Sequence, residues 1–189
     1  KVRFIYSWDD YDVFRKVPLN FPKQDLLKEY LRKPIADTPD PYGCHKSYAE
    51  HNEKEVEESI PLVDVHPQFL YQHKKYRAGE YDKEIKKALE SNEEIKSILD
   101  KFRDSDVDEK WLPVTMFCEK CGKDTVLITW KGGFTIHYTC ECGHSDTFEF
   151  NKKHLLKLKW RVDWPMRWFF EKVDFEPGGK DHSTAGGSY

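Results

Sequence analysis

Four cysteines stand in two closely spaced pairs, and this pattern restricts what the chain can fold into. The two turns read Cys118-Glu-Lys-Cys121-Gly122 and Cys140-Glu-Cys142-Gly143, and a strand-like segment with a Lys131-Gly132-Gly133 turn separates them. A structural zinc ion needs four ligands in a tetrahedron, and two cysteine-bearing turns at strand ends supply them. The sequence therefore predicts a zinc ribbon over about residues 114–150.

The fourth ligand of this ribbon stays open between Cys142 and His144. Only one residue separates Cys140 from Cys142, so His144 could replace Cys142. We favour Cys142 because ribbons most often use four thiolates. Buried free thiols are the plain alternative, but four cysteines in two such turns disfavour it. A thioredoxin-like redox pair is also disfavoured, since no βαβ pattern surrounds Cys118.

The composition limits the class of protein. The chain has 189 residues, enough for one large domain or two small ones. Its 31 basic and 34 acidic residues nearly balance, so total charge neither favours nor excludes a nucleic-acid partner. The apolar runs are far below the roughly 18 residues of a membrane span. The 5 cysteines are an odd number, which fits metal ligation in a reducing cytoplasm better than disulfides.

A second group of metal-ligand side chains lies near residue 40. Zinc accepts every ligand type in this group, which consists of Asp40, Cys44, His45 and His51. Gly43 would let the loop curl around an ion. Histidines and aspartates in a polar loop are more often ordinary surface residues, so the spacing alone leaves both readings open.

The hydrophobic periodicity predicts helices first and strands later. Helices are expected over residues 24–32, 47–58, 68–77, 80–90 and 93–103, the last with a Ser91–Glu94 capping box. Strands are expected over residues 2–7, 114–117, 125–130, 134–140, 147–150 and 173–176. Residues 34–43 hold three prolines and a glycine and are expected to form a loop.

The last predicted strand leads into Gly178-Gly179-Lys180-Asp181-His182, which would open a helix. Ligands bind at such strand-to-helix junctions in doubly wound sheets, and glycines let backbone N–H groups approach a nucleotide. The segment is not a Walker P-loop, because Asp181 follows Lys180. Taken alone, an ordinary turn is the commoner interpretation.

Three longer motifs carry a resemblance to a known family. They are Arg3-Phe-Ile-Tyr-Ser-Trp-Asp-Asp-Tyr-Asp12, Trp160-Arg-Val-Asp-Trp-Pro-Met-Arg-Trp168 and Phe175-Glu-Pro-Gly-Gly-Lys-Asp-His-Ser-Thr-Ala-Gly-Gly-Ser-Tyr189. Through them the chain resembles class I lysyl-tRNA synthetases over essentially its whole length. The resemblance implies an α/β fold: a Rossmann-type catalytic domain, residues 1–23 and 156–189, split by an inserted α+β zinc-binding domain, residues 24–155, that includes the ribbon.

The resemblance also implies chemistry. Lysine and ATP, with magnesium, would form lysyl-adenylate, and the lysyl group would pass to its tRNA. Gly178, Gly179, Asp181 and His182 would line the adenylate site, with Asp181 and His182 as the catalytic residues. Trp160 and His182 would border the lysine pocket, where an aromatic face can hold an ammonium group. The likeness further strengthens the site near Asp40, and so implies two zinc ions.

Three carboxylates, Asp9, Asp10 and Asp163, are further candidates, but solvated or structural roles explain them equally well. The family's His-Ile-Gly-His and Lys-Met-Ser-Lys-Ser signatures and its anticodon-reading region are not among these residues. We therefore expect an internal fragment that does not aminoacylate tRNA alone.

The alternative function is a non-catalytic zinc-ribbon module that binds nucleic acid. The stretch from Trp160 to Tyr189 disfavours it, because a bare ribbon does not need these motifs. A zinc hydrolase is disfavoured too, since both candidate metal sites look fully ligated and leave no position for water.

Overall fold

The computed structural model describes residues 2–102 and 107–183, which fold into helices and strands in mixed order. The strands are β1 Ile5–Trp8, β2 Gln68–Tyr71, β3 Val114–Met116, β4 Val126–Gly132, β5 Thr135–Cys140, β6 Ser145–Glu149 and β7 Leu156–Leu158. The α-helices are α1 Gln24–Lys28, α2 Tyr48–Ser59, α3 Gln72–Arg77, α4 Asp82–Glu90, α5 Asn92–Asp100, α6 Phe150–Lys153 and α7 Trp160–Glu171. Short 3₁₀ turns are η1 Ile35–Asp37, η2 Ile60–Val63 and η3 Lys180–Ser183. This mixed content agrees with the predicted α/β class.

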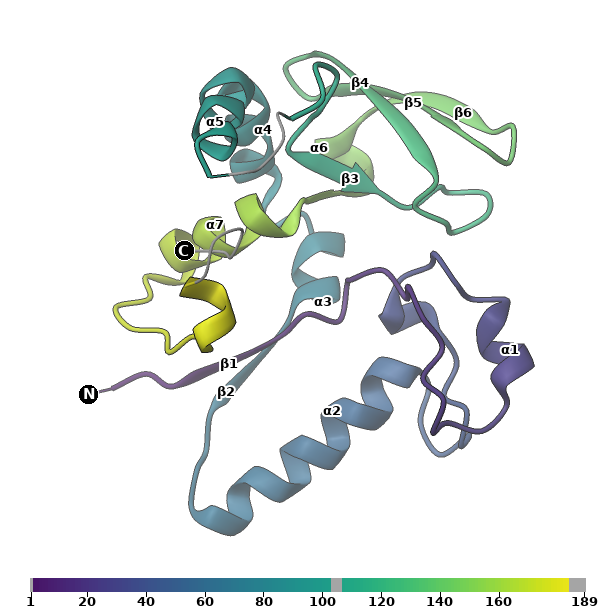
Figure 1. Cartoon of the computed structure of the whole chain (residues 1–189), viewed down its shortest axis with the longest axis vertical. Coiled ribbons are helices and arrows are strands. Elements are labelled where there is room, and N and C mark those ends of the chain that lie inside the picture. The colour runs from purple at the N-terminus through teal and green to yellow at the C-terminus, as the bar shows by residue number, and fades with distance from the viewer. Residues whose placement is uncertain (1, 103–106, 184–189) are drawn as a thin grey trace.

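Two strands far apart in sequence pair in parallel at the centre of the molecule (Figure 1). β1 and β2 run in register from the Ile5–Gln68 pair to the Trp8–Tyr71 pair. Parallel strands need a long crossover between them, and α2 lies within it. The helix expected over residues 68–77 is therefore wrong for its first four residues, which form β2, and right for α3. Pairing with β1, a non-local contact, decides the conformation there.

The predicted ribbon is an antiparallel meander. β5 pairs with β4 on one side and with β6 on the other. Ile136, Tyr138 and Phe148 point to one face and are almost fully buried. The expected hairpin is confirmed: β4 ends at Gly132, and Gly132 and Gly133 both have positive φ, 98° and 55°. Glycine adopts such angles without a β-carbon clash.

One hydrophobic core joins the ribbon to the helices α3 and α4. β3 and β7 pair antiparallel, and Met116, Leu156 and Leu158 are buried between the meander and α4. The turn before α4 requires glycine: a β-carbon on Gly79 would lie 2.4 Å from the ring of His154. The core therefore spans the borders of the predicted insertion, because β3 lies within residues 24–155 and β7 outside them.

Two further expectations are wrong. Residues 173–176 form no strand. Lys172, which follows the last residue of α7, has a left-handed conformation, and the chain then turns back along the helix. The capping box between Ser91 and Glu94 does not form, since the Ser91 side chain makes no cap hydrogen bond. A side-chain cap does form on another helix, α2, where the Ser47 hydroxyl oxygen accepts from the Glu50 amide at 3.1 Å.

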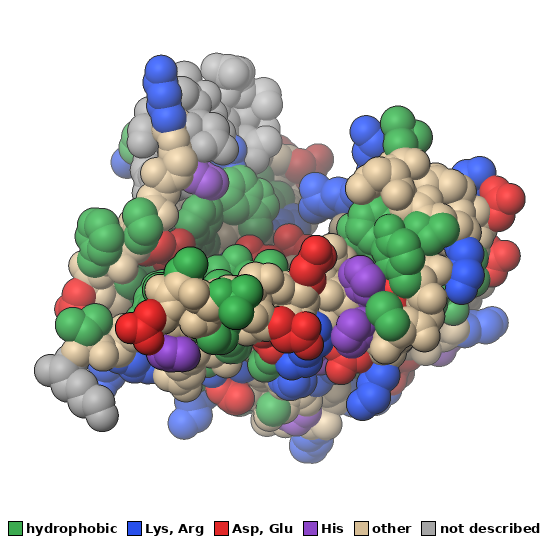
Figure 2. Space-filling model, turned by 90° about the horizontal axis from the view of Figure 1, so that it is seen from below, with side chains coloured by type: hydrophobic (Ala, Val, Ile, Leu, Met, Phe, Trp, Pro, Cys, Tyr) green, Lys and Arg blue, Asp and Glu red, His purple; other side chains and the backbone are tan. Residues whose placement is uncertain are grey.

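The surface shows no strong bias in charge on the face seen in Figure 2, where acidic and basic side chains are interspersed. This agrees with the nearly balanced total of 31 basic and 34 acidic residues. Within residues 2–102 and 107–183, no helix has the length and apolar character that a bilayer crossing requires.

Candidate functional site

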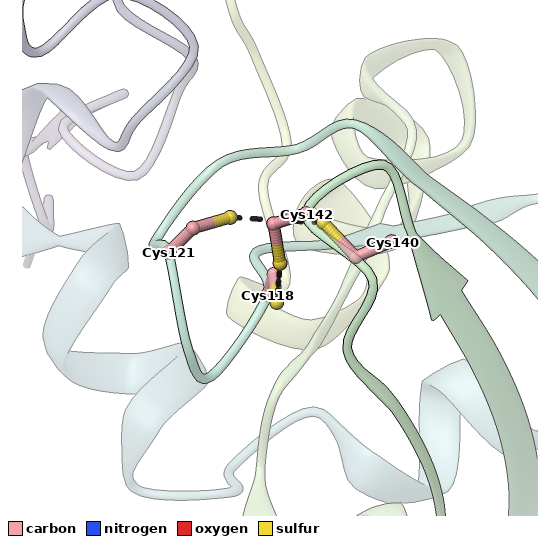
Figure 3. Close-up of side chains that lie close together, drawn as sticks. All are labelled: Cys118, Cys121, Cys140 and Cys142. Carbon is pink, nitrogen blue, oxygen red and sulfur yellow. Dashed lines mark hydrogen bonds between the residues drawn. The ribbon is translucent and has the colours of Figure 1, made fainter.

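The four ribbon cysteines converge at one end of the meander (Figure 3). Cys118 and Cys121 come from the turn after β3, Cys140 ends β5, and Cys142 lies in the turn before β6. The sulfurs of Cys118 and Cys142 are 3.8 Å apart and those of Cys121 and Cys140 are 3.6 Å apart. Zinc–sulfur bonds of about 2.3 Å in a tetrahedron place neighbouring sulfurs about 3.8 Å apart. The donor set fits a zinc ion.

Backbone hydrogen bonds shape the two cysteine turns. The Gly122 amide donates to the Cys118 carbonyl at 2.8 Å, and the Gly143 amide donates to the Cys140 carbonyl at 2.9 Å. Both glycines have positive φ, 73° and 82°. His144, the alternative fourth ligand, places its ring 5.8 Å from that of Tyr138. Cys142 rather than His144 completes the group of four, as the sequence favoured; zinc binding itself stays a prediction.

The thiols influence one another's ionisation. Burial raises the pKa of Cys121 to about 12, and hydrogen bonds with the neighbouring thiols add to the shift. Burial would raise the pKa of Cys140 too, but hydrogen bonds from the Cys142 amide and thiol lower it to about 7. Four clustered thiolates need a cation to offset their charge, so metal binding at this site would release protons.

The second candidate metal site forms at the loop before α2. One ligand atom from each of Asp40, Cys44, His45 and His51 lies within 4.8 Å of the others. The Cys44 sulfur is 3.2 Å from Nδ1 of both histidines, and Asp40 Oδ1 is 3.4 Å from His51 Nδ1. Asp40 is buried and accepts from the amides of Tyr42, Cys44 and His45, which fix its carboxylate. The four side chains fit zinc as well.

Removing His51 tests this second site. We expect the unmodified chain to hold about two zinc ions and His51→Ala to hold about one, because a structural site needs all four ligands. Metal analysis of purified protein gives the stoichiometry. His66→Ala is the matched control, since His66 is exposed and outside both clusters. One zinc ion in the unmodified chain, unchanged by His51→Ala, would return these residues to an ordinary surface loop.

A stripe of tryptophans on α7 faces the predicted adenylate segment. Trp160, Trp164 and Trp168 are spaced four residues apart and so share one face of the helix. Adjacent ring centroids are 6.1 Å and 6.0 Å apart. The ring of His182 meets Trp164 edge-on at 4.9 Å. The rings of the predicted partners Trp160 and His182 thus both contact the ring of Trp164, which the sequence analysis did not single out although its spacing was visible.

The double glycine lies on the surface just before η3. Gly178 and Gly179 are exposed, and the His182 amide donates to the Gly179 carbonyl at 3.0 Å. The predicted helix start is a 3₁₀ turn over Lys180–Ser183, where the described residues end. The side chain of Asp181, the other predicted catalytic residue, lies outside what the structure describes.

The three candidate carboxylates have structural partners. Asp9 pairs with Arg167 at 2.6 Å, and Asp10 accepts from the His73 amide at 2.7 Å and also pairs with the His73 ring. Asp163 is buried, hydrogen-bonds the Tyr76 hydroxyl and lies 3.3 Å from Arg167.

Arg167 emerges here as a residue that the sequence analysis missed. Burial alone would lower the pKa of its guanidinium, but the carboxylates of Asp163 and Asp9 raise it above the usual range. Its Nη1 also donates to Ser7 Oγ at 3.2 Å. Arg167 therefore fixes α7, and with it the tryptophan stripe, against the carboxyl end of β1.

Comparison with known proteins identifies the family of the chain. The model of the family described as tRNA synthetases class I (K) matches residues 1–189. Lysine–tRNA ligases of Borrelia garinii and Treponema pallidum are each 47% identical to the chain over 190 and 191 residues, and that of Thermococcus kodakarensis is 46% identical over 193. Each match covers 100% of this chain and 36% of the relative, so the chain spans about a third of their length. The chain belongs to the class I (K) family of tRNA synthetases.

Proposed function

We propose that the protein carrying this chain is a lysine–tRNA ligase, which uses ATP and magnesium to form lysyl-adenylate and then transfers the lysyl group to tRNA. The observation that carries the proposal is the packing of His182 against the tryptophan face of α7. Membership in the family and the printed names of the relatives, lysine–tRNA ligases, support it. Such an enzyme would work in the cytoplasm, where tRNA is charged.

The residues divide the work between an amino-acid pocket and an adenylate site. Trp160 is 45% exposed, so its ring remains available to a ligand. An indole face attracts a lysine ammonium by cation–π interaction. Gly178 and Gly179 would bring backbone amides to the adenylate phosphate, with His182 and Asp181 beside the reacting groups. Such catalysis depends chiefly on positioning and on stabilising charge.

The domain organisation belongs to the same proposal. Residues 1–23 and 156–189 would form parts of a Rossmann-type catalytic domain, and residues 24–155 a zinc-binding insertion. The parallel pairing of β1 and β2 supports a Rossmann-type sheet, and the β4–β6 meander with its four cysteines supports the ribbon. Both candidate metal sites have four donors each, which suits structural zinc.

Trp160→Ala in the complete enzyme tests the proposed function. We expect the KM for lysine to rise by about twofold to thirtyfold, since a cation–π contact contributes roughly 0.5–2 kcal/mol. The KM for ATP should stay unchanged, because the lost contact is to the ammonium side chain. Lysine-dependent pyrophosphate exchange measures both constants without tRNA.

The matched control is Phe169→Ala, which removes a 77% exposed ring from the same helix. No lysine-dependent exchange in the unmodified enzyme would overturn the proposed function. Equal lysine KM values in the Trp160 and Phe169 variants would remove Trp160 from the pocket. No contact in the described residues favours the alternative, a non-catalytic nucleic-acid-binding module.

A further inference from the structure

A single indole contacts both ends of the double-glycine segment. On one side, Nε1 of Trp164 donates to Glu176 Oε1 at 2.7 Å. On the other side, the Trp164 ring meets His182 at 4.9 Å between centroids, nearly perpendicular at 87°. Gly178 and Gly179 lie between these two contacts along the chain. Trp164 therefore helps to hold a segment whose two adjacent glycines give the backbone little conformational restriction.

Glu176 is fixed by two indoles rather than one. Its second carboxylate oxygen accepts from Nε1 of Trp168, one helical turn beyond Trp164. Indole N–H groups are donors only, and a carboxylate offers two acceptor oxygens, so the two partners match in number and kind. Hydrogen bonds to an ionised acceptor are also stronger than those between neutral groups. The Glu176 side chain thus ties the returning chain to the rigid face of α7.

The same indole connects His182 to Trp160. The Trp160 and Trp164 centroids are 6.1 Å apart, within the range of favourable aromatic contacts. The side chain of Trp160 is more exposed to solvent than that of Trp164, which is half-buried. The relative position of Trp160 and His182 is therefore set by Trp164.

We propose that Trp164 and Glu176 are positioning residues, which set His182 and the double-glycine segment relative to Trp160 in the lysine pocket. This inference rests on the proposed function. Neither residue needs to touch the substrate. Both act in part through the hydrogen bond between the Trp164 indole and the Glu176 carboxylate, so substitution of either partner should impair lysine activation. Lysine activation should suffer because Trp160 and His182, the two residues assigned to the pocket, both contact Trp164.

Trp164→Phe removes this hydrogen bond, and Glu176→Gln weakens the contacts of residue 176 with the two indoles, both with little change of shape. The amide of glutamine keeps a single acceptor oxygen for two donors, and phenylalanine keeps a ring for His182 but has no N–H. In the complete enzyme we expect each variant to lower kcat/KM for lysine by about tenfold in pyrophosphate exchange, with the KM for ATP unchanged. The double variant should lose less than the product of the two single effects, because residues that share a contact are not additive.

Trp164→Leu should lower kcat/KM for lysine further, since it removes the ring contact to His182 as well. Phe169→Leu, on the exposed side of the same helix, is the control and should behave as the unmodified enzyme. In protein with isotope-labelled histidine, the NMR signal of His182 should move in Trp164→Leu and stay in Phe169→Leu, because an aromatic ring shifts its neighbours' resonances. This readout does not depend on activity.

The outcomes separate the inference from the proposed function. An unmodified enzyme without lysine-dependent exchange overturns the function. A working enzyme whose Glu176→Gln and Trp164→Phe effects simply multiply, or reach ATP and lysine alike, overturns the positioning role alone. An unmoved His182 signal in Trp164→Leu does so too.

Discussion

Cys118→Ser is expected to abolish zinc binding by the ribbon and to unfold the β4–β6 meander. Serine has nearly the size of cysteine but is a poor zinc ligand, so the change removes one corner of the tetrahedron without a large cavity. The effect should be large, because zinc binding contributes about 10–16 kcal/mol to folding in small zinc modules. That exceeds the stability of many whole domains, which is about 5–15 kcal/mol.

The loss of structure should extend beyond the ribbon to the core that it shares with β3 and β7. Ile136, Tyr138 and Phe148 belong to the core that also contains Met116 and Leu158. Losing the meander would expose one side of the β3–β7 pair. Hydrogen exchange of the β4–β6 amides measures the unfolding, and metal analysis measures the zinc.

His144→Ala is the matched control for this prediction. His144 lies next to the second cysteine turn but outside the group of four, so its loss should leave both zinc ions and the slow exchange intact. A Cys118→Ser protein that keeps two zinc ions and protected strands would contradict the zinc-ribbon interpretation. Zinc loss in His144→Ala would instead make that histidine the fourth ligand.

His182→Ala in the complete enzyme is expected to depress lysyl-adenylate formation by about a hundredfold or more. Removing one preorganised donor from a site of developing charge typically has this effect on the rate. The fall should appear in kcat rather than in the KM for lysine, since His182 would act on the reacting groups. Single-turnover measurement of adenylate formation separates this step from transfer to tRNA.

His137→Ala is the control for His182→Ala. This histidine lies on the outer face of the ribbon, with its ring 2.9 Å from the Thr147 hydroxyl, and has no contact with α7 among the described residues. It should leave adenylate formation unchanged. If His182→Ala forms adenylate at the unmodified rate, His182 is not catalytic, and only its packing against Trp164 would remain.

Local patterns in the sequence were sufficient for the ribbon and the individual helices. The β4–β6 strands, the Gly132–Gly133 hairpin and the helices α2, α4 and α5 agree with the predictions within a few residues. These elements follow from short-range periodicity and turn chemistry, which depend on neighbouring residues alone. The failures at residues 68–71 and 173–176 occur where contacts with another segment decide the conformation, whereas the Ser91–Glu94 capping box failed although it is a local pattern. β2 needs β1 as its partner, and Glu176 needs two indoles.

The candidate sites divide in the same way. The sequence alone determined which residues carry donor atoms: the two cysteine turns, the Asp40–His51 cluster and the motif around His182 all consist of near neighbours in the chain. Only the tertiary structure decided that Cys142 rather than His144 completes the sulfur group and that the Trp164 ring contacts the rings of both Trp160 and His182. The physical reason is that ligand type belongs to each side chain, whereas the distances between side chains depend on how β5, α7 and the returning chain pack together.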